Sequence, residues 1–359
     1  MSLSRPPRSG CGLRPRVPVL AVAVLVLAAA CGGGGRKAAI GPSPTSAPVI
    51  APAVTTTTLP PIAPLTGLPL TDAAKLRRPA LTIKIENPPV ARPQSGLDAA
   101  DVVFEEVVEG GITRFLAVFQ STDANLVGPV RSVRPSDPDV VGPFGGLFGY
   151  SGGTPKFIDL LRSTPGVFDV GVDLLDEGPG KAYFRQPGRS APDNLYTSTS
   201  ALWAAGPAKA PPPPAFGPFL PAGQPFTGAG ATPAVHLNAR VGDTFAVYDY
   251  DPATSTYTRG GLVDNGGRVA AANVIVQFTD YEPSPGDEDV NGTPVERAVT
   301  VGTGDALILA GGTAVKGTWT KSSQSAYPAY TDGDGNPVKL LPGRTWIELA
   351  RNGAPVSTG

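Results

Sequence analysis

The side chains best suited to ligand chemistry are concentrated between positions 92 and 135, where arginine and glutamate alternate with apolar residues. Several guanidinium groups that are held in place by carboxylates can bind an anionic group through paired hydrogen bonds. Free backbone N–H groups at the start of a helix can add further donors. The candidate ligand-binding residues are Arg92, Gln94, Glu105, Glu109, Arg114, Arg131, Arg134, Gly153, Thr154, Arg185, Arg189 and Asn194. The alternative is that these charges only form salt bridges on a sheet face, where such pairs contribute little.

The pair Gly110–Gly111 stands between two apolar runs that are rich in β-branched and aromatic residues. Because glycine readily adopts positive φ, this pattern predicts a β-hairpin with a two-residue turn. In the corresponding register, Glu105 and Glu109 lie diagonally about Arg114 on one sheet face. Glu106 then falls on the other, mostly apolar face. An arginine beside two carboxyl groups lowers the pKa of both, which favours a scaffold that holds arginines over a pair of catalytic acids.

Hydrolysis of an envelope polymer is the alternative function. Glu105 and Glu109 could serve as the paired carboxylates of a glycan hydrolase. Residues 149–153 fit the G-x-S-x-G pattern, which would make Ser151 the nucleophile of an ester hydrolase. His236 is the only histidine of the chain, so any catalytic triad would need it. The sequence does not decide whether any of these residues is catalytic.

No metal ion or other cofactor is expected from these residue types. One histidine excludes a histidine-rich metal site. The acidic run Asp332–Asn336 resembles the start of a calcium-binding loop, but the later glycine and glutamate that such a loop requires are absent. The run therefore predicts a turn between strands.

The first 30 residues have the features of a signal peptide. Arginines without an acidic residue precede the apolar run Val17–Ala30, which is shorter than a membrane span. The run ends in small residues followed by Cys31 and four glycines, which resembles a bacterial lipoprotein signal. Cys31 would then carry the lipid and hold the exported protein on the outer face of the cell membrane. The alternative is an ordinary secretory signal that is cleaved nearby.

Composition divides the rest of the chain into four parts. Residues 31–64 are rich in glycine, proline and threonine, which predicts a disordered tether. Residues 65–203 predict an N-terminal domain of mixed strands and short helices, and residues 236–359 predict a domain of mostly antiparallel strands. Between them, residues 204–235 are rich in proline, alanine and glycine, which indicates a linker or a wrapping loop. The fold class is therefore α+β, and 45 glycines with 42 prolines argue against a helical bundle.

Local patterns place individual elements in the first domain. The alternating run Leu81–Glu86 predicts a strand that ends before two prolines. Phe144–Tyr150 predicts a buried strand, and Lys156–Arg162 predicts a short helix after it. Thr154 suits the N-cap of that helix, and Pro155 suits its first position.

Charge narrows the range of partners. The net charge of the whole chain is −1, and removal of the arginine-rich signal peptide makes it more negative. Such a balance argues against general nucleic-acid binding. The expected partners are the membrane, through the lipid, and an anionic envelope ligand such as a cell-wall polymer, or an envelope protein.

Several segments resemble the YerB-like lipoproteins, a bacterial family of unknown function. These segments lie at residues 92–97, 100–101, 109–115, 128–132, 189–196, 273–277 and 342–347. The resemblance implies an exported lipoprotein of two domains, and it implies no established reaction. One departure is Asp193, which stands where the family pattern has a histidine. If that histidine carried acid–base or metal chemistry in relatives, this chain would have lost or altered it.

Overall fold

The computed structural model describes residues 41, 60–178, 180–264, 267–289 and 292–359. The chain divides into two units, residues 1–57 and 58–359, and all described helices and strands lie in the second. Cys31 and the expected signal peptide lie outside the described residues. In the part of the chain that the structure describes, no helix is long and apolar enough to cross a membrane.

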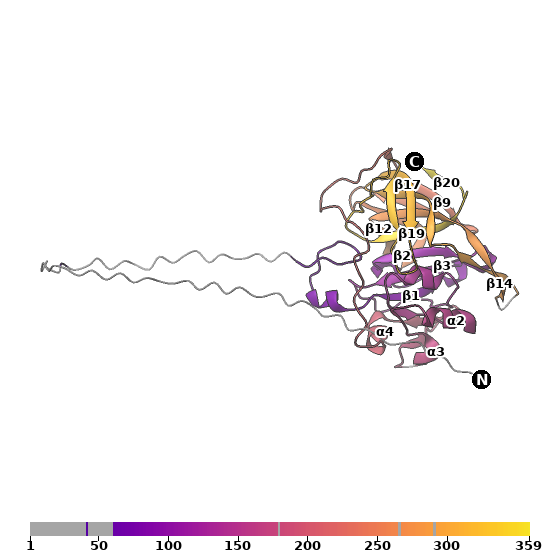
Figure 1. Ribbon diagram of the computed structural model, residues 1–359. Coiled ribbons are helices and arrows are strands. Elements are labelled where there is room, and N and C mark those ends of the chain that lie inside the picture. The colour runs from indigo at the N-terminus through magenta and orange to yellow at the C-terminus, as the bar shows by residue number, and fades with distance from the viewer. Residues whose placement is uncertain (1–40, 42–59, 179, 265–266, 290–291) are drawn as a thin grey trace, which may run out of the picture. The chain divides into compact units, whose positions relative to one another are not determined.

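Eleven strands form the larger sheet, which contains elements from both halves of the chain. In spatial order they are β18 (Ala329–Asp332), β17 (Thr313–Lys321), β16 (Gly302–Ala310), β13 (Asn273–Thr279), β19 (Thr345–Arg351), β2 (Val102–Val107), β3 (Thr113–Phe119), β1 (Leu81–Glu86), β4 (Gly146–Gly149) and β5 (Val167–Asp169), with β8 (Thr232–Pro233) beside β17. Strands β19 and β2 pair in parallel and lie next to each other in Figure 1. A strand from the end of the chain thus joins the two halves within one sheet.

A second sheet and two hairpins complete the β-structure. The second sheet has the order β12 (Gly267–Ala271), β11 (Thr256–Asp264), β10 (Thr244–Asp251), β9 (His236–Val241) and β20 (Val356–Thr358). The hairpins are β14 (Tyr281–Glu288) with β15 (Pro294–Ala298), and β6 (Tyr183–Arg185) with β7 (Leu195–Thr197). The strands after residue 235 pair antiparallel with one another except where β19 meets β13.

The helices are few and short, so the expected prevalence of strands is confirmed. The α-helices are α1 (Asp137–Val141), α2 (Pro155–Arg162), α3 (Val172–Leu175) and α4 (Thr199–Ala205). The 3-10 turns are Ala73–Arg77, Pro89–Ala91, Leu97–Ala99 and Glu109–Gly111. In Figure 1 the labelled helices α2, α3 and α4 lie on the β1 side of the large sheet, away from β17 and β19.

The proline-rich segment of residues 206–231 packs along the fold without helix or strand of its own. The Phe216 N–H donates to the Pro64 carbonyl at 2.9 Å, and the Leu220 N–H donates to the Leu340 carbonyl at 2.8 Å. The Phe216 ring is buried and stacks on Phe144, with ring centroids 5.9 Å apart. The segment therefore wraps over both halves of the chain.

Both faces of the large sheet are covered at its centre. Every residue of β1, β2 and β3 is buried. One apolar cluster packs on the face that carries Val103 and Phe115, and another packs on the face that carries Phe104 and Leu116. Because alternate residues of a strand point to opposite faces, charged side chains on these strands are enclosed on either side. They are Lys84, Glu86, Glu105, Glu106 and Arg114.

The register between β2 and β3 differs by one residue from the expected register. The Val108 N–H donates to the Ile112 carbonyl at 2.8 Å, so three residues, Glu109–Gly111, form the turn. Glu106 therefore lies opposite Arg114. A slip of one residue moves each side chain to the other face of a strand. The expectation that Glu105 shares a face with Arg114 is therefore wrong, and Glu106 takes that place.

Candidate ligand-binding cleft

Half of the twelve predicted binding residues line one cleft of about 690 Å³. These are Glu109, Arg114, Arg131, Arg134, Gly153 and Thr154. The lining also includes two acidic residues, Glu288 and Asp289, at the end of β14 and just beyond it. The cleft thus combines the β2–β3 turn, the segment before α1, the start of α2 and the β14–β15 hairpin.

Backbone hydrogen bonds fix the segment that carries Arg131 and Arg134. The Arg131 N–H donates to the Lys84 carbonyl at 3.0 Å on one side. On the other side, the Ser151 N–H donates to the Arg131 carbonyl at 2.9 Å. The Val133 N–H donates to the Gly152 carbonyl at 3.1 Å. This segment is therefore held between β1 and the turn that leads into α2, which brings its arginines to the cleft.

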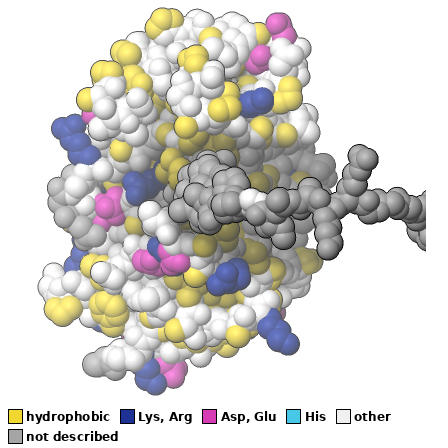
Figure 2. All heavy atoms as spheres, turned by 90° about the vertical axis from the view of Figure 1, so that its left-hand side faces the viewer, with side chains coloured by type: hydrophobic (Ala, Val, Ile, Leu, Met, Phe, Trp, Pro, Cys, Tyr) yellow, Lys and Arg dark blue, Asp and Glu magenta, His cyan; other side chains and the backbone are white. Residues whose placement is uncertain are grey.

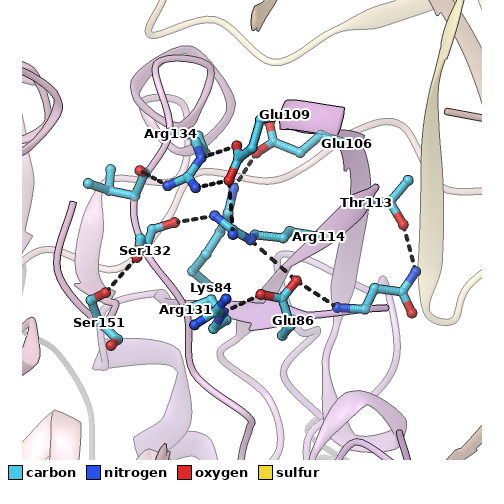
Figure 3. A network of polar contacts seen from close by, with 12 residues as sticks. Lys84, Glu86, Glu106, Glu109, Thr113, Arg114, Arg131, Ser132, Arg134 and Ser151 are labelled. Atoms are coloured by element: carbon cyan, nitrogen blue, oxygen red, sulfur yellow. Dashed lines mark hydrogen bonds and ion pairs between the residues drawn. The ribbon is translucent and has the colours of Figure 1, made fainter. Parts of the chain in front are cut away.

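Glu109 holds two arginines in place. The Arg134 guanidinium contacts both carboxylate oxygens, with Nε 2.6 Å from Oε2 and Nη2 against Oε1. Arg114 Nη2 donates to the same Oε1 at 3.2 Å (Figure 3). Burial alone would raise the pKa of Glu109, but the hydrogen bonds of Arg134 and the charge of Arg114 outweigh it and hold the pKa at about 2. Glu109 is therefore ionised at neutral pH and acts as an anchor for arginines.

Arg131 differs from the other two arginines of the cleft. Its Nε donates to the buried carboxylate of Glu86, and its side chain is 23% exposed, compared with 3% for Arg114. Among the described residues, the structure records no partner for the two Nη groups of Arg131. These groups keep the donors that a planar anion such as a carboxylate or a phosphate face requires.

The start of α2 adds polar groups beside these arginines. Thr154 is the N-cap residue and Pro155 the first helical residue, as expected, but the Thr154 side chain makes no capping hydrogen bond. Its Oγ1 is buried and has no partner among the described residues. Gly153 has a φ of 154°, and a Cβ at this position would lie 2.5 Å from Val133 Cγ1. Glycine therefore allows the turn to approach the arginine-bearing segment.

A second group of buried charges, around Lys84, lies next to the residues of the cleft and was not predicted. Lys84 Nζ contacts Glu106 Oε1 and lies 2.5 Å from Asp137 Oδ1, and the Lys84 and Glu106 side chains are fully buried. The other oxygen of Asp137 accepts the Arg134 N–H at 2.7 Å. Burial raises the pKa of Glu106 to about 7, against the charge of Lys84. The only signal was a lysine within the apolar alternation of β1, which by itself indicates a solvent-facing side.

Glu105 belongs to a different network on the opposite face of the sheet. Its Oε1 accepts hydrogen bonds from Asn87 Nδ2 at 3.0 Å and Thr113 Oγ1 at 2.7 Å. Its Oε2 lies 2.6 Å from Arg259 Nη2 in β11. The arginine also lies 3.9 Å from Glu348 in β19. Glu105 is therefore fully engaged in joining strands from the two halves of the chain.

Arg92 and Gln94 support the chain beside the cleft without lining it. Arg92 Nε donates to the Asn87 carbonyl at 3.1 Å. The Gln94 side chain is buried and donates to the carbonyl of Glu86 at 3.1 Å and to the side-chain oxygen of Asn87 at 3.1 Å. These two residues fix the loop that follows β1.

Arg185, Arg189 and Asn194 form a separate group around the β6–β7 hairpin. Arg185 Nη1 donates to Asn194 Oδ1 at 2.9 Å. Arg189 Nη1 donates to the Ala91 carbonyl at 3.0 Å. None of these three residues lines the cleft, although Pro192 from the same segment does. Three of the six candidate arginines, Arg114, Arg131 and Arg134, therefore line the cleft, and Arg92, Arg185 and Arg189 do not.

The geometry gives no support to a serine triad. The Ser151 carbonyl accepts a hydrogen bond from Ser132 Oγ at 2.8 Å in the large-sheet region. His236 lies in β9 of the other sheet, where its Nδ1 is 2.8 Å from Asp249 Oδ1. Among the described residues, no group of three or more His, Cys, Asp or Glu side chains is placed to hold a metal ion.

One face of the molecule shows no broad basic patch. On the face shown in Figure 2, basic and acidic side chains lie scattered and mixed. Long stretches of one charge sign, which would attract a nucleic acid, are not visible on that face.

Comparisons with known proteins give the family. Residues 65–211 match the N-terminal domain, and residues 235–347 the C-terminal domain, of a protein of unknown function named DUF3048. The Bacillus subtilis (strain 168) protein named "Putative lipoprotein YerB" is 31% identical over 310 residues, which cover 80% of this chain and 85% of that protein. The crystal structure of Bacillus subtilis YerB matches with a TM-score of 0.67 and 26% identity, over 83% of this chain and 99% of that one. The chain therefore belongs to the YerB-like family of unknown function, which is built from the N- and C-terminal DUF3048 domains.

Proposed function

We propose that this protein is an exported, lipid-anchored binding protein that holds an anionic group of an envelope ligand or partner in the cleft at Arg131. Two observations support the anchor. Cys31 follows an apolar run and small residues, and the relative YerB carries a lipoprotein name. A lipid on Cys31 followed by the expected tether would hold the folded unit near the outer face of the membrane. The end of the predicted tether belongs to the fold instead, because Ala63 is buried and Pro64 accepts a hydrogen bond from Phe216.

The observation that carries the binding proposal is the uneven use of the three arginines. Glu109 engages Arg114 and Arg134, so these two side chains form a fixed, mostly buried base. Arg131 is oriented by Glu86 through Nε alone and offers its remaining donors to the cleft. Pre-orientation lowers the conformational entropy that binding must overcome.

The acidic residues of the lining limit the kind of ligand. Glu288 is exposed on the side of the cleft formed by β14, and it carries the same charge as an anionic ligand. A simple anion would be repelled there. The arrangement favours a ligand with a phosphate or carboxylate at Arg131 and with hydroxyl or amino groups toward Glu288.

The residues offered for hydrolysis do not suit that role. A glycan hydrolase needs one carboxyl group with a raised pKa near the bond to be cleaved. The pKa of Glu109 is lowered, and Glu105 is buried with three hydrogen-bond partners on the other face of the sheet. No reaction is therefore proposed.

Retention on isolated cell-wall material tests the proposal. The full chain, purified in detergent, should co-sediment with cell walls that retain their anionic polymers, and Arg131→Gln should reduce the bound fraction. Arg268→Gln is the matched control because Arg268 is an exposed arginine of β12 outside the cleft. Equal retention of both variants would contradict the proposal.

A further inference from the structure

A larger cleft of about 860 Å³ shares no lining residue with the cleft at Arg131. One side is formed by residues of the N-terminal DUF3048 domain, including Asp101 and Thr122. The other side is formed by residues of the C-terminal domain, including Tyr250 and Arg344. The wrapping segment contributes Gln224. Its volume is in the range of sites that hold small organic ligands.

Hydroxyl groups are the most frequent polar groups of this cleft. They belong to Thr66, Ser121, Thr122, Tyr250, Thr254, Ser255, Thr256 and Thr313. Some of these hydroxyl groups already have hydrogen-bond partners; for example, Thr254 Oγ1 lies 2.8 Å from Thr256 Oγ1. For the side chains of Tyr250, Ser255, Thr313 and Gln224, the structure records no hydrogen bond with any described residue. These groups can donate to or accept from a ligand that is rich in hydroxyl groups.

Arg344 is the only lysine or arginine among the residues that line this cleft. Its side chain is partly exposed, and no ion pair with a described residue is recorded for it. The one acidic residue of the lining, Asp101, accepts the Gln120 N–H at 2.6 Å and the Ser121 N–H at 2.7 Å. Burial raises the pKa of Asp101, and the nearby charge of Arg344 acts against this rise. No hydrogen bond or ion pair from the Arg344 side chain to a described residue is recorded, so its guanidinium donors can still bind an anion.

An aromatic ring provides an apolar platform in the same cleft. The Tyr250 ring packs against Tyr257, with centroids 5.1 Å apart. A Cβ at Gly312 would lie only 2.9 Å from Tyr250 Cε1, so glycine lets the backbone approach this ring closely. These contacts hold the ring of Tyr250, which lines the cleft, in place. A sugar ring presents C–H groups on one face and hydroxyls at its edge, which suits such a platform.

We infer that this cleft binds a saccharide that bears a carboxylate, with the carboxylate at Arg344 and the sugar ring against Tyr250. The free side chains of Gln224, Ser255 and Thr313 would bond the sugar hydroxyls. This site is independent of the proposed anion site at Arg131, because it uses other residues and requires a sugar ring.

Calorimetric titration of the full chain in detergent tests this inference with three probes. N-acetylmuramic acid carries a lactyl carboxylate, N-acetylglucosamine lacks it, and lactate lacks the sugar. We expect N-acetylmuramic acid to bind about 10- to 100-fold more tightly than either of the others, because a charged hydrogen-bonded pair is added to the sugar contacts. Arg344→Gln should remove the preference over N-acetylglucosamine, and Tyr250→Ala should weaken both sugars.

The variants separate this site from the first cleft. Arg268→Gln should leave the binding of N-acetylmuramic acid unchanged, because Arg268 is exposed and lines neither cleft. Loss of binding in Arg131→Gln alone would assign the sugar to the other cleft and overturn the inference. Equal affinities of Arg344→Gln and the unchanged protein would overturn it as well. Arg344→Lys, which keeps the charge, should recover part of the preference and shows that the fold tolerates a change of this side chain.

Discussion

Glu106 and Glu109 lie three residues apart, yet the pKa values of their carboxyl groups are shifted in opposite directions. Glu106 is enclosed beside Lys84, and burial raises its pKa to about 7. Glu109 faces the cleft, where Arg134 and Arg114 overcome the effect of burial and lower its pKa to about 2. The turn between β2 and β3 thus places one carboxyl group in the core and the other among arginines.

Glu106 should make the protein less stable as the pH rises. Between the ordinary pKa of 4.5 and the folded-state value of about 7, the folded state keeps a proton that the unfolded state has released. The contribution of Glu106 to the free energy of unfolding therefore falls across this window, by up to about 3 kcal/mol at 1.4 kcal/mol per pKa unit. Urea unfolding at pH 5 and pH 7.5 should show this decrease, and Glu106→Gln should reduce it. Parallel pH profiles of the two proteins would contradict the burial of an ionisable Glu106.

Glu109 should have the opposite pH dependence. Its folded-state pKa lies below the ordinary value, so it stabilises the fold above pH 4.5, and that contribution is lost as the pH falls toward 2. Glu109→Gln leaves Arg114 and Arg134 without their shared partner and should lower the free energy of unfolding by about 3 kcal/mol at pH 7. The difference between variant and unchanged protein should shrink at pH 3. An equal difference at both pH values would count against the arginine contacts.

Glu105 should contribute to the stability of the fold through its ion pair with Arg259. Removing its charge with Glu105→Gln leaves Arg259, which is 3% exposed, without its closest carboxylate and should cost about 3–5 kcal/mol of unfolding free energy. Asp243→Asn is the control, because the Arg240–Asp243 pair is exposed and should contribute less than about 1 kcal/mol. Chemical denaturation measures both. A loss for Glu105→Gln no larger than that of the control would show that the two halves do not depend on this pair.

The lipid anchor predicts a change of location. Cys31→Ser should release the protein from the membrane fraction, because the lipid is the expected attachment. Cys11→Ser lies within the expected signal peptide and should leave the protein in the membrane fraction. Fractionation with an antibody against the folded unit measures both. Membrane retention of Cys31→Ser would contradict lipid attachment at this residue.

The sequence predicted local elements better than contacts between distant segments. The strand Leu81–Glu86 and the helix that follows Thr154 were predicted from alternation and capping, which depend on neighbouring residues alone. The predicted register between β2 and β3 was wrong by one residue. The two glycines indicate a turn, but they do not indicate whether two or three residues form it.

Half of the residues predicted for the candidate site line the cleft, and the others do not, because their positions depend on contacts between distant segments. Glu109 and Arg134, both proposed as binding residues, form an ion pair in the cleft, although the sequence did not show that the fold would bring them together. The pairing of Glu105 with Arg259 joins residues 154 positions apart, and β19 reaches β2 from the end of the chain. No local pattern in the sequence indicates such contacts.

The most direct test of the binding claim is the affinity of the full chain for a defined phosphate polymer, poly(glycerol phosphate), with inorganic phosphate as a competitor. Arg131→Gln should weaken binding about 10-fold or more, since one charged hydrogen-bonded contact is lost, while Arg268→Gln should bind as the unchanged protein does. The thermal unfolding midpoint of Arg131→Gln confirms that it is folded. If the folded Arg131→Gln variant binds the polymer as tightly as the unchanged protein, the cleft at Arg131 does not hold the anion.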